Sequence, residues 1–85
     1  MNTNVNEDLK KIIIRNSTIA LAENDIQDDT DLISDLGFDS VKLIQLVVDI
    51  ENKFGFEFQD EDLSFEILSK YSDLQEYIEK RISFV

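Results

Sequence analysis

The chain contains no histidine, no cysteine and no proline, and it has only two glycines. Without histidine and cysteine it lacks the usual proton shuttle near neutral pH, the usual sulfur nucleophile and any disulfide framework. A reactive thiol would therefore have to be attached from outside. The scarcity of proline and glycine favours long helices joined by polar loops. The absence of cysteine also suits a cytoplasmic protein.

Positive charge is scarce as well. Eight Lys and Arg residues stand against 19 Asp and Glu residues, which gives a formal net charge of −11. Such a chain repels phosphate backbones and anionic lipid surfaces, so we expect no nucleic acid and no membrane partner; basic protein surfaces are the natural partners. No run of eighteen apolar residues occurs, and no apolar segment of signal-peptide length follows a basic start, so neither membrane insertion nor secretion is predicted.

Hydrophobic residues nevertheless make up 42% of the chain, well above the content of disordered sequences, so we predict a folded protein. A length of 85 residues leaves room for one hydrophobic core. The sequence therefore predicts a single domain over residues 1–85 with a folded core at about 5–82, and a monomer as the default state.

Apolar periodicity predicts helices at about residues 5–20 and 40–54, a short third helix from about Asp60, and a last helix opened by a capping box at Ser72-Asp73-Leu74-Gln75. Gly55 is placed to end the second helix in the left-handed conformation. Between the first two helices runs a long acidic loop, anchored by four apolar side chains: Ile26, Leu32, Ile33 and Leu36. The expected fold is all-α, a small four-helix bundle with three main helices, a short third helix and a long loop between the first and second.

The predicted second helix has more apolar positions than one buried stripe requires. One face is suited to the core and comprises Leu43, Leu46, Val47, Ile50 and Phe54. A second stripe, formed by Val41, Ile44 and Val48, lies on another side. Either the bundle surrounds this helix and buries both stripes, or the second stripe is exposed and binds partner proteins. We favour the docking surface.

Ser40 is the candidate site of chemistry. Serine is a common helix N-cap, but Asp39 is at least as good a cap, so Ser40 is expected at the first helical position with its hydroxyl pointing outward. An anion attached there would lie at the positive end of the helix dipole, which stabilises it by ~0.3–1 kcal/mol. Gly37 allows the chain to turn sharply into the helix.

The segment Asp35-Leu36-Gly37-Phe38-Asp39-Ser40-Val41, followed by a helix that ends in Glu51-Asn52-Lys53-Phe54-Gly55, resembles the acyl and peptidyl carrier proteins. The resemblance covers nearly the whole chain. It implies that a phosphopantetheinyl transferase attaches 4′-phosphopantetheine from coenzyme A to Ser40, within a motif that includes Gly37 and Asp39. The thiol of that arm then bears acyl or aminoacyl groups as thioesters, so the resemblance implies a carrier and not an enzyme.

The resemblance also implies that the helix after Ser40 is presented to partner enzymes that load, condense or modify the cargo, with Val41, Ile44, Gln45 and Val48 as candidate contacts. Carriers of dissociated bacterial fatty acid synthesis usually place acidic residues along this helix. Here Lys42 and Gln45 occupy matching positions, and the formal charge over residues 41–53 is zero. This departure favours nonribosomal peptide or polyketide assembly, with fatty acid synthesis as the alternative.

A calcium-binding EF-hand loop starting at Asp31 would place Ile33 at position three and Lys42 at position twelve, where oxygen ligands are required, so no metal site is predicted. An enzyme is not supported, because no serine has a histidine, cysteine or lysine placed to activate it. An unmodified acidic helical adaptor is the other alternative, since an apolar stripe suits it equally well.

Overall fold

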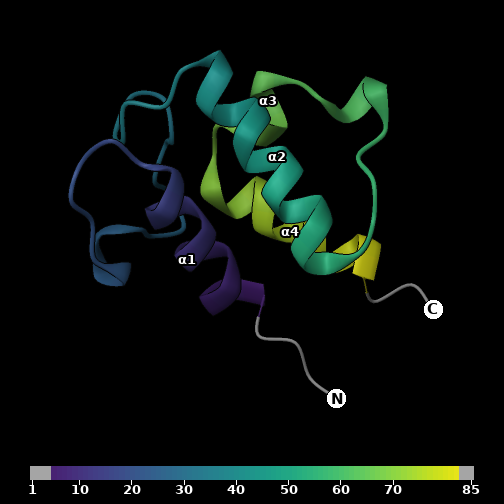
Figure 1. The fold of residues 1–85 in the computed structure, drawn as a ribbon, viewed down its shortest axis with the longest axis horizontal. Helices are drawn as coiled ribbons and strands as arrows, with labels where there is room; N and C mark the ends of the chain where they lie inside the picture. Colours follow the sequence, from purple (N-terminus) through teal and green to yellow (C-terminus); the bar gives the residue numbers. More distant parts are fainter. Residues whose placement is uncertain (1–4, 83–85) are drawn as a thin grey trace.

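The computed structural model describes residues 5–82 (Figure 1). Its elements are α1 (Val5–Asn16), the 3₁₀ turn η1 (Glu23–Asp25), α2 (Ser40–Phe54), the 3₁₀ turn η2 (Asp60–Asp62), α3 (Phe65–Leu68) and α4 (Tyr71–Ile82). This order confirms the predicted all-α bundle with three main helices, a short third one and a long loop before α2. Within residues 5–82 the only β pairing is an isolated bridge between Asp31 and Lys70, and no helix there is long and apolar enough to cross a membrane.

The core lies between the three long helices. In Figure 1, α1 and α2 lie in front and α4 passes behind α2. Each long helix contributes fully buried side chains, among them Leu9, Ile13, Leu43, Leu46, Ile50, Tyr71, Leu74 and Ile78. Burying an aliphatic side chain of this size stabilises a fold by about 1.5–3 kcal/mol, so these contacts hold the bundle together.

Tyr71 is the largest of the fully buried side chains. Its hydroxyl donates hydrogen bonds to the backbone carbonyl of Asn6, at 3.1 Å, and to the Asn6 side-chain oxygen. Burial raises the pKa of the Tyr71 hydroxyl, so it stays a protonated donor. The start of α4 is thereby bonded to the start of α1.

The predicted end of the first helix is wrong: α1 ends at Asn16, not near residue 20. The Asn16 amide folds back and donates to the Ile12 carbonyl at 3.0 Å, and the Ser17 N–H donates to the Ile14 carbonyl at 3.2 Å. The Ser17 bond takes the Ile14 carbonyl, which residue 18 would have used in a longer helix. Ile19, which the periodicity assigned to the helix, is 48% exposed.

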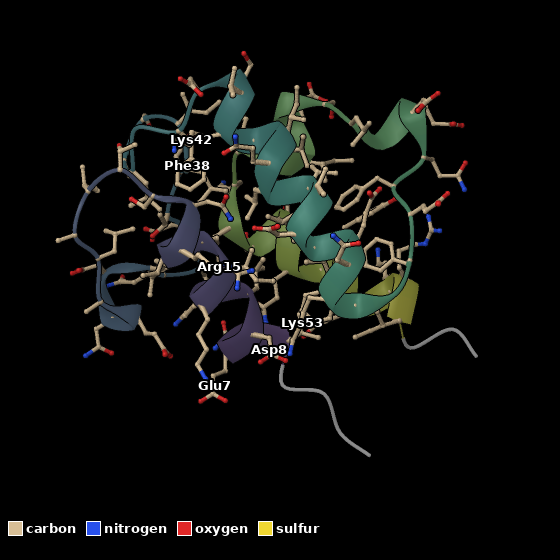
Figure 2. All side chains as sticks on the ribbon, viewed as in Figure 1. Glu7, Asp8, Arg15, Phe38, Lys42 and Lys53 are labelled. Carbon is tan, nitrogen blue, oxygen red and sulfur yellow. The ribbon has the colours of Figure 1, made fainter. Side chains whose placement is uncertain are left out.

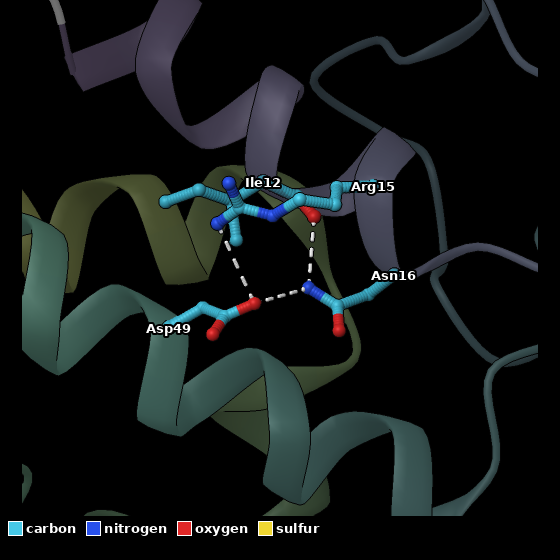
Figure 3. Close-up of polar contacts among 4 residues, drawn as sticks. All are labelled: Ile12, Arg15, Asn16 and Asp49. Carbon is cyan, nitrogen blue, oxygen red and sulfur yellow. Dashed lines mark hydrogen bonds and ion pairs between the residues drawn. The ribbon is translucent and has the colours of Figure 1, made fainter.

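The same asparagine joins α1 to α2 (Figure 3). Asn16 Nδ2 donates to Asp49 Oδ2 at 2.8 Å, and the Arg15 guanidinium lies 3.6 Å from that oxygen. Because one carboxylate oxygen on α2 receives both groups, the end of α1 is held against the middle of α2.

The long loop is ordered, and it is fastened to the junction between α3 and α4. Three backbone bonds connect them: Leu32 N–H to the Ser69 carbonyl at 2.6 Å, Tyr71 N–H to Thr30 at 2.9 Å and Ser72 N–H to Asp28 at 3.2 Å. Of the predicted anchors, Ile26, Leu32 and Leu36 are buried, whereas Ile33 is 38% exposed, so its assignment as an anchor is wrong.

Two helix starts also differ from prediction. Around Asp60 the chain forms only η2, and α3 begins at Phe65. Helix α4 begins at Tyr71, so Ser72 lies inside it and does not form the predicted capping box. The carbonyls of Thr30 and Asp28 accept the first amides of α4 instead, because the long loop is already docked there.

Candidate functional site

The chain turns into α2 through Leu36, Gly37 and Phe38. Leu36 and Phe38 are buried, and Phe38 donates its N–H to the Leu32 carbonyl at 2.9 Å. Gly37 between them has φ 76°, a left-handed conformation that favours glycine. Figure 2 places Phe38 beside the start of α2. The sharp turn predicted at Gly37 is confirmed, and it delivers the next residues to the helix start.

Asp39 is the N-cap of α2, as predicted. Its Oδ1 accepts the Lys42 N–H at 2.9 Å, and its carbonyl accepts the Leu43 N–H at 2.9 Å. Ser40 is therefore the first helical residue, and it is exposed. Because the Asp39 carboxylate caps the helix, the Ser40 hydroxyl is not needed for that role.

The acidic residues before Gly37 bind their own backbone. Asp31 Oδ1 accepts the N–H groups of Ile33 at 2.8 Å and Ser34 at 2.9 Å, while Asp35 Oδ2 accepts the Asp31 N–H at 2.8 Å. The backbone hydrogen bond from Ser34, followed by that from Ile33, lowers the pKa of Asp31 despite an opposing effect of desolvation. Within residues 5–82 no group of three or more His, Cys, Asp or Glu side chains is placed to hold a metal ion.

An apolar groove of about 660 Å³ runs along α2. Leu63 and Ser64, which follow η2, and Leu68 of α3 form its other wall. Figure 1 shows the chain that leads from α2 through η2 to α3 at the right of α2. The lining residues are Ser40, Leu43, Ile44, Val47, Val48, Glu51, Leu63, Ser64 and Leu68. We call this the α2–α3 groove. Ser40 is thus both exposed and a lining residue.

The second apolar stripe of α2 is exposed. Val41 is 61% exposed, Ile44 64% and Val48 47%, so the alternative in which the bundle buries them is wrong. Gln45 is also exposed. Ile44 and Val48 share the groove with Ser40, whereas Val41 and Gln45 lie outside its lining. The structure therefore divides the predicted contact residues between the groove and the open surface.

Sequence reasoning missed the α2–α3 groove. Leu63, Ser64 and Leu68 come from a segment whose helical pattern is weak, and no spacing along the chain relates them to α2. Glu51 belongs to the helix end that carries the family resemblance, but nothing in the sequence relates it to a groove beside Ser40. Only the return of the chain along α2 brings these residues together.

Comparison with known proteins identifies the kind of site. Residues 7–78 match the family model described as a phosphopantetheine attachment site. The acyl carrier protein of Thermotoga maritima is 39% identical over 64 residues, covering 75% of this chain and 76% of the relative. That of Chlamydia trachomatis is 33% identical over 75 residues, covering 88% and 92%. A third, from Coprothermobacter proteolyticus, is 40% identical over 57 residues, covering 67% of each.

These relatives are named acyl carrier proteins. The names fit the predicted alternative, an acyl carrier of fatty acid synthesis, better than the favoured prediction of nonribosomal peptide or polyketide assembly. The match to a phosphopantetheine attachment site also favours a modified carrier over an unmodified adaptor. The chain belongs to the acyl carrier protein family, a family of non-catalytic carriers whose covalent cofactor is 4′-phosphopantetheine.

Proposed function

We propose that this chain carries fatty acyl intermediates of fatty acid synthesis as thioesters on a phosphopantetheine arm attached to Ser40. One observation carries the proposal: the exposed serine at the start of α2 also lines an apolar groove. An arm attached at that serine starts beside a surface on which an alkyl chain can be buried.

The residues around Ser40 fit the cofactor. In attachment, the Ser40 oxygen would bond to the phosphorus of 4′-phosphopantetheine as the pyrophosphate bond of coenzyme A breaks, with loss of the hydroxyl proton and release of adenosine 3′,5′-bisphosphate. This requires an accessible oxygen that is not needed to cap the helix. The Asp39 carboxylate accepts the Lys42 N–H, so the Ser40 hydroxyl is not needed to cap α2. The resulting phosphodiester is an anion at the N-terminus of a 15-residue helix, where the macrodipole is favourable. When bound, the cofactor supplies the thiol that this cysteine-free chain lacks.

The lining of the α2–α3 groove supports an alkyl cargo. The lining offers four apolar side chains: Leu43, Val47, Leu63 and Leu68. Each methylene group of the cargo that moves from water into the groove lowers the free energy by about 0.8 kcal/mol. A protonated α-amino group of an aminoacyl cargo would find one carboxylate here, that of Glu51 at the far end of the α2 wall, and beside Ser40 it would meet apolar side chains that do not replace its water. The groove and the names of the relatives thus favour fatty acyl groups.

The exposed side of α2 is our candidate docking face for the phosphopantetheinyl transferase and for the enzymes that load, condense or modify acyl groups. It comprises Val41, Ile44, Gln45 and Val48 next to Ser40. Its centre is apolar and formally uncharged, which favours recognition by buried area over steering by long-range charge. We propose that the chain acts there as a monomeric single-domain carrier in the cytoplasm.

Intact-mass measurement tests the attachment site. Wild-type protein is incubated with coenzyme A and a broad-specificity phosphopantetheinyl transferase, and it should gain one phosphopantetheine. Ser40→Ala should gain none while its free energy of unfolding stays within about 0.5 kcal/mol of wild type, because Asp39 still caps α2. Ser64→Ala is the matched control, since it removes the other serine hydroxyl of the groove, and it should load normally. A loaded Ser40→Ala protein, or an unmodified wild type, would refute the assignment.

A further inference from the structure

Glu51 differs from the other described residues that line the α2–α3 groove, because it alone is ionisable. It lies on α2 roughly three helical turns beyond Ser40, toward the end of the helix. Ser40 and Glu51 therefore mark opposite ends of the α2 side of the groove. The side chains between them on that wall, Leu43, Ile44, Val47 and Val48, are apolar.

The Glu51 carboxylate is held in position by the chain that follows α2. Its Oε2 accepts the Phe58 N–H at 2.9 Å, and Glu51 is half-buried. Phe58 is itself buried, with its ring 4.9 Å from the Tyr77 ring and 5.3 Å from the Phe56 ring. An aromatic cluster on α4 and the post-α2 segment thus fixes the backbone that Glu51 binds.

Gly55 makes this arrangement possible. Its φ of 78° ends α2 and turns the chain back, and its N–H donates to the Glu51 carbonyl at 2.9 Å. Glu51 therefore accepts one bond through its backbone, at the end of the helix, and one through its side chain, from the returning segment. A change of the Glu51 side-chain rotamer would break the Phe58 bond, so that bond fixes the position of the carboxylate.

A carboxylate in this place limits what the groove can accept. An alkyl chain that enters beside Ser40 meets apolar side chains until it reaches Glu51, and there further burial would strip water from a charged group. The gain from each added methylene would then be offset by the loss of carboxylate hydration. Apolar contact is favourable along the groove and unfavourable at its end.

We infer that Glu51 sets the length of acyl chain that the α2–α3 groove accommodates. This inference rests on the proposed function, because it takes the cargo to be an acyl group carried from Ser40. Glu51 acts as a specificity-determining residue through its charge and its position. Neither is needed for attachment of the arm.

The test uses full-length protein loaded, through acyl-coenzyme A and the transferase, with a graded series of straight saturated chains from butyryl to palmitoyl. Intact mass first confirms loading, and the urea midpoint of each acyl form is then compared with that of the non-acylated holo form. In wild type the midpoint should rise with chain length and then level off. In Glu51→Gln the rise should continue to longer chains, because a neutral amide loses less on burial than a carboxylate.

Glu51→Gln keeps an oxygen that can accept the Phe58 N–H, so its non-acylated form should unfold at the wild-type midpoint. Glu51→Met provides a second variant that extends the apolar lining, and it should also move the levelling point to longer chains. Glu57→Gln is the matched control: Glu57 is exposed and lies outside the described lining, so its chain-length profile should follow wild type.

The outcomes separate the two proposals. Failure of wild-type loading in the mass spectrum refutes the proposed function, and the inference with it. Successful loading with no levelling in wild type, or with the same levelling point in wild type, Glu51→Gln and Glu51→Met, overturns the inference alone. A shift in Glu57→Gln equal to that in Glu51→Gln would show a general charge effect and would also overturn it.

Discussion

Single carboxylates shape the approach to Ser40. Backbone N–H groups close in sequence donate to the carboxylates of Asp31, Asp35 and Asp39. These carboxylates therefore satisfy backbone donors that a helix or sheet would satisfy with carbonyl groups. The charge of this acid-rich segment, taken alone, would predict a solvated surface. The hydrogen bonds show that part of that charge is structural.

At this scale the pH dependence of Asp31 can be predicted. Its folded-state pKa lies below its ordinary value, so its stabilising effect is complete above the unfolded pKa of about 3.9 and is lost as the pH falls through the folded pKa. The difference in unfolding free energy between wild type and Asp31→Asn should therefore shrink as the pH is lowered below about 4. Urea unfolding over a pH series measures it.

Asp29→Asn is the control for loss of charge alone, because Asp29 is an exposed aspartate in the same loop. A gap between wild type and Asp31→Asn that stays constant or widens toward acid pH would contradict the role given to the Asp31 hydrogen bonds.

At the scale of the element, α2 serves three surfaces at once. Leu43, Leu46 and Ile50 are buried in the core, Ser40 with Ile44 and Val48 borders the groove, and Val41 extends the exposed stripe. A 15-residue helix can do this because its side chains point around the full circumference. The excess apolar residues of α2 are exposed and do not belong to a deeper core, which fits the docking face that we propose.

A pair of substitutions separates these surfaces. Leu46→Ala removes a fully buried side chain and should lower the free energy of unfolding by about 2–5 kcal/mol. Ile44→Ala removes a side chain that is 64% exposed and should change it by less than about 1 kcal/mol, while slowing loading by the transferase. Urea unfolding and a timed mass assay give the two readouts.

Each variant controls for the other, since both shorten a large aliphatic side chain on the same helix. Normal loading rates in Ile44→Ala would remove that residue from the proposed docking face. A large loss of stability would place it in the core.

At the scale of the whole molecule, packing holds together a strongly acidic chain. The net charge is −11, and the cations that bind across the bundle include Arg15, which lies by Asp49 in Figure 3. Arg81 likewise stacks against the aromatic cluster, 5.4 Å from the Phe56 ring centroid. A surface ion pair such as Arg15–Asp49 contributes little, so the repulsion is opposed mainly by the buried side chains.

Salt should therefore stabilise the fold. Between low ionic strength and about 0.3 M NaCl, screening shortens the range of the repulsion, and the midpoint of thermal unfolding should rise. Calorimetry over a NaCl series measures the midpoint, with an equal osmolarity of uncharged solute as the control. A midpoint that falls with salt would show that attractive ion pairs outweigh the repulsion.

The features that the sequence predicted correctly are those that depend on neighbouring residues. Periodicity of 3.6 residues and the chemistry of adjacent residues give the limits of α2, the Asp39 cap and the turns at Gly37 and Gly55. The same stretch carries the resemblance that led to the carrier family, and that family was confirmed.

Tertiary structure alone decided the remainder. Helix α1 ends at Asn16, where the side chain also reaches Asp49 on α2, and α4 begins at Tyr71 because the long loop supplies acceptors for its first amides. The α2–α3 groove exists because the chain beyond Gly55 returns to α2 and brings Leu63 and Leu68 into one lining with Val47. Such contacts join residues that are distant in sequence, and no local pattern specifies which of them meet in space. The sequence by itself determined which serine stands at the start of α2, and the fold determined which side chains lie beside it.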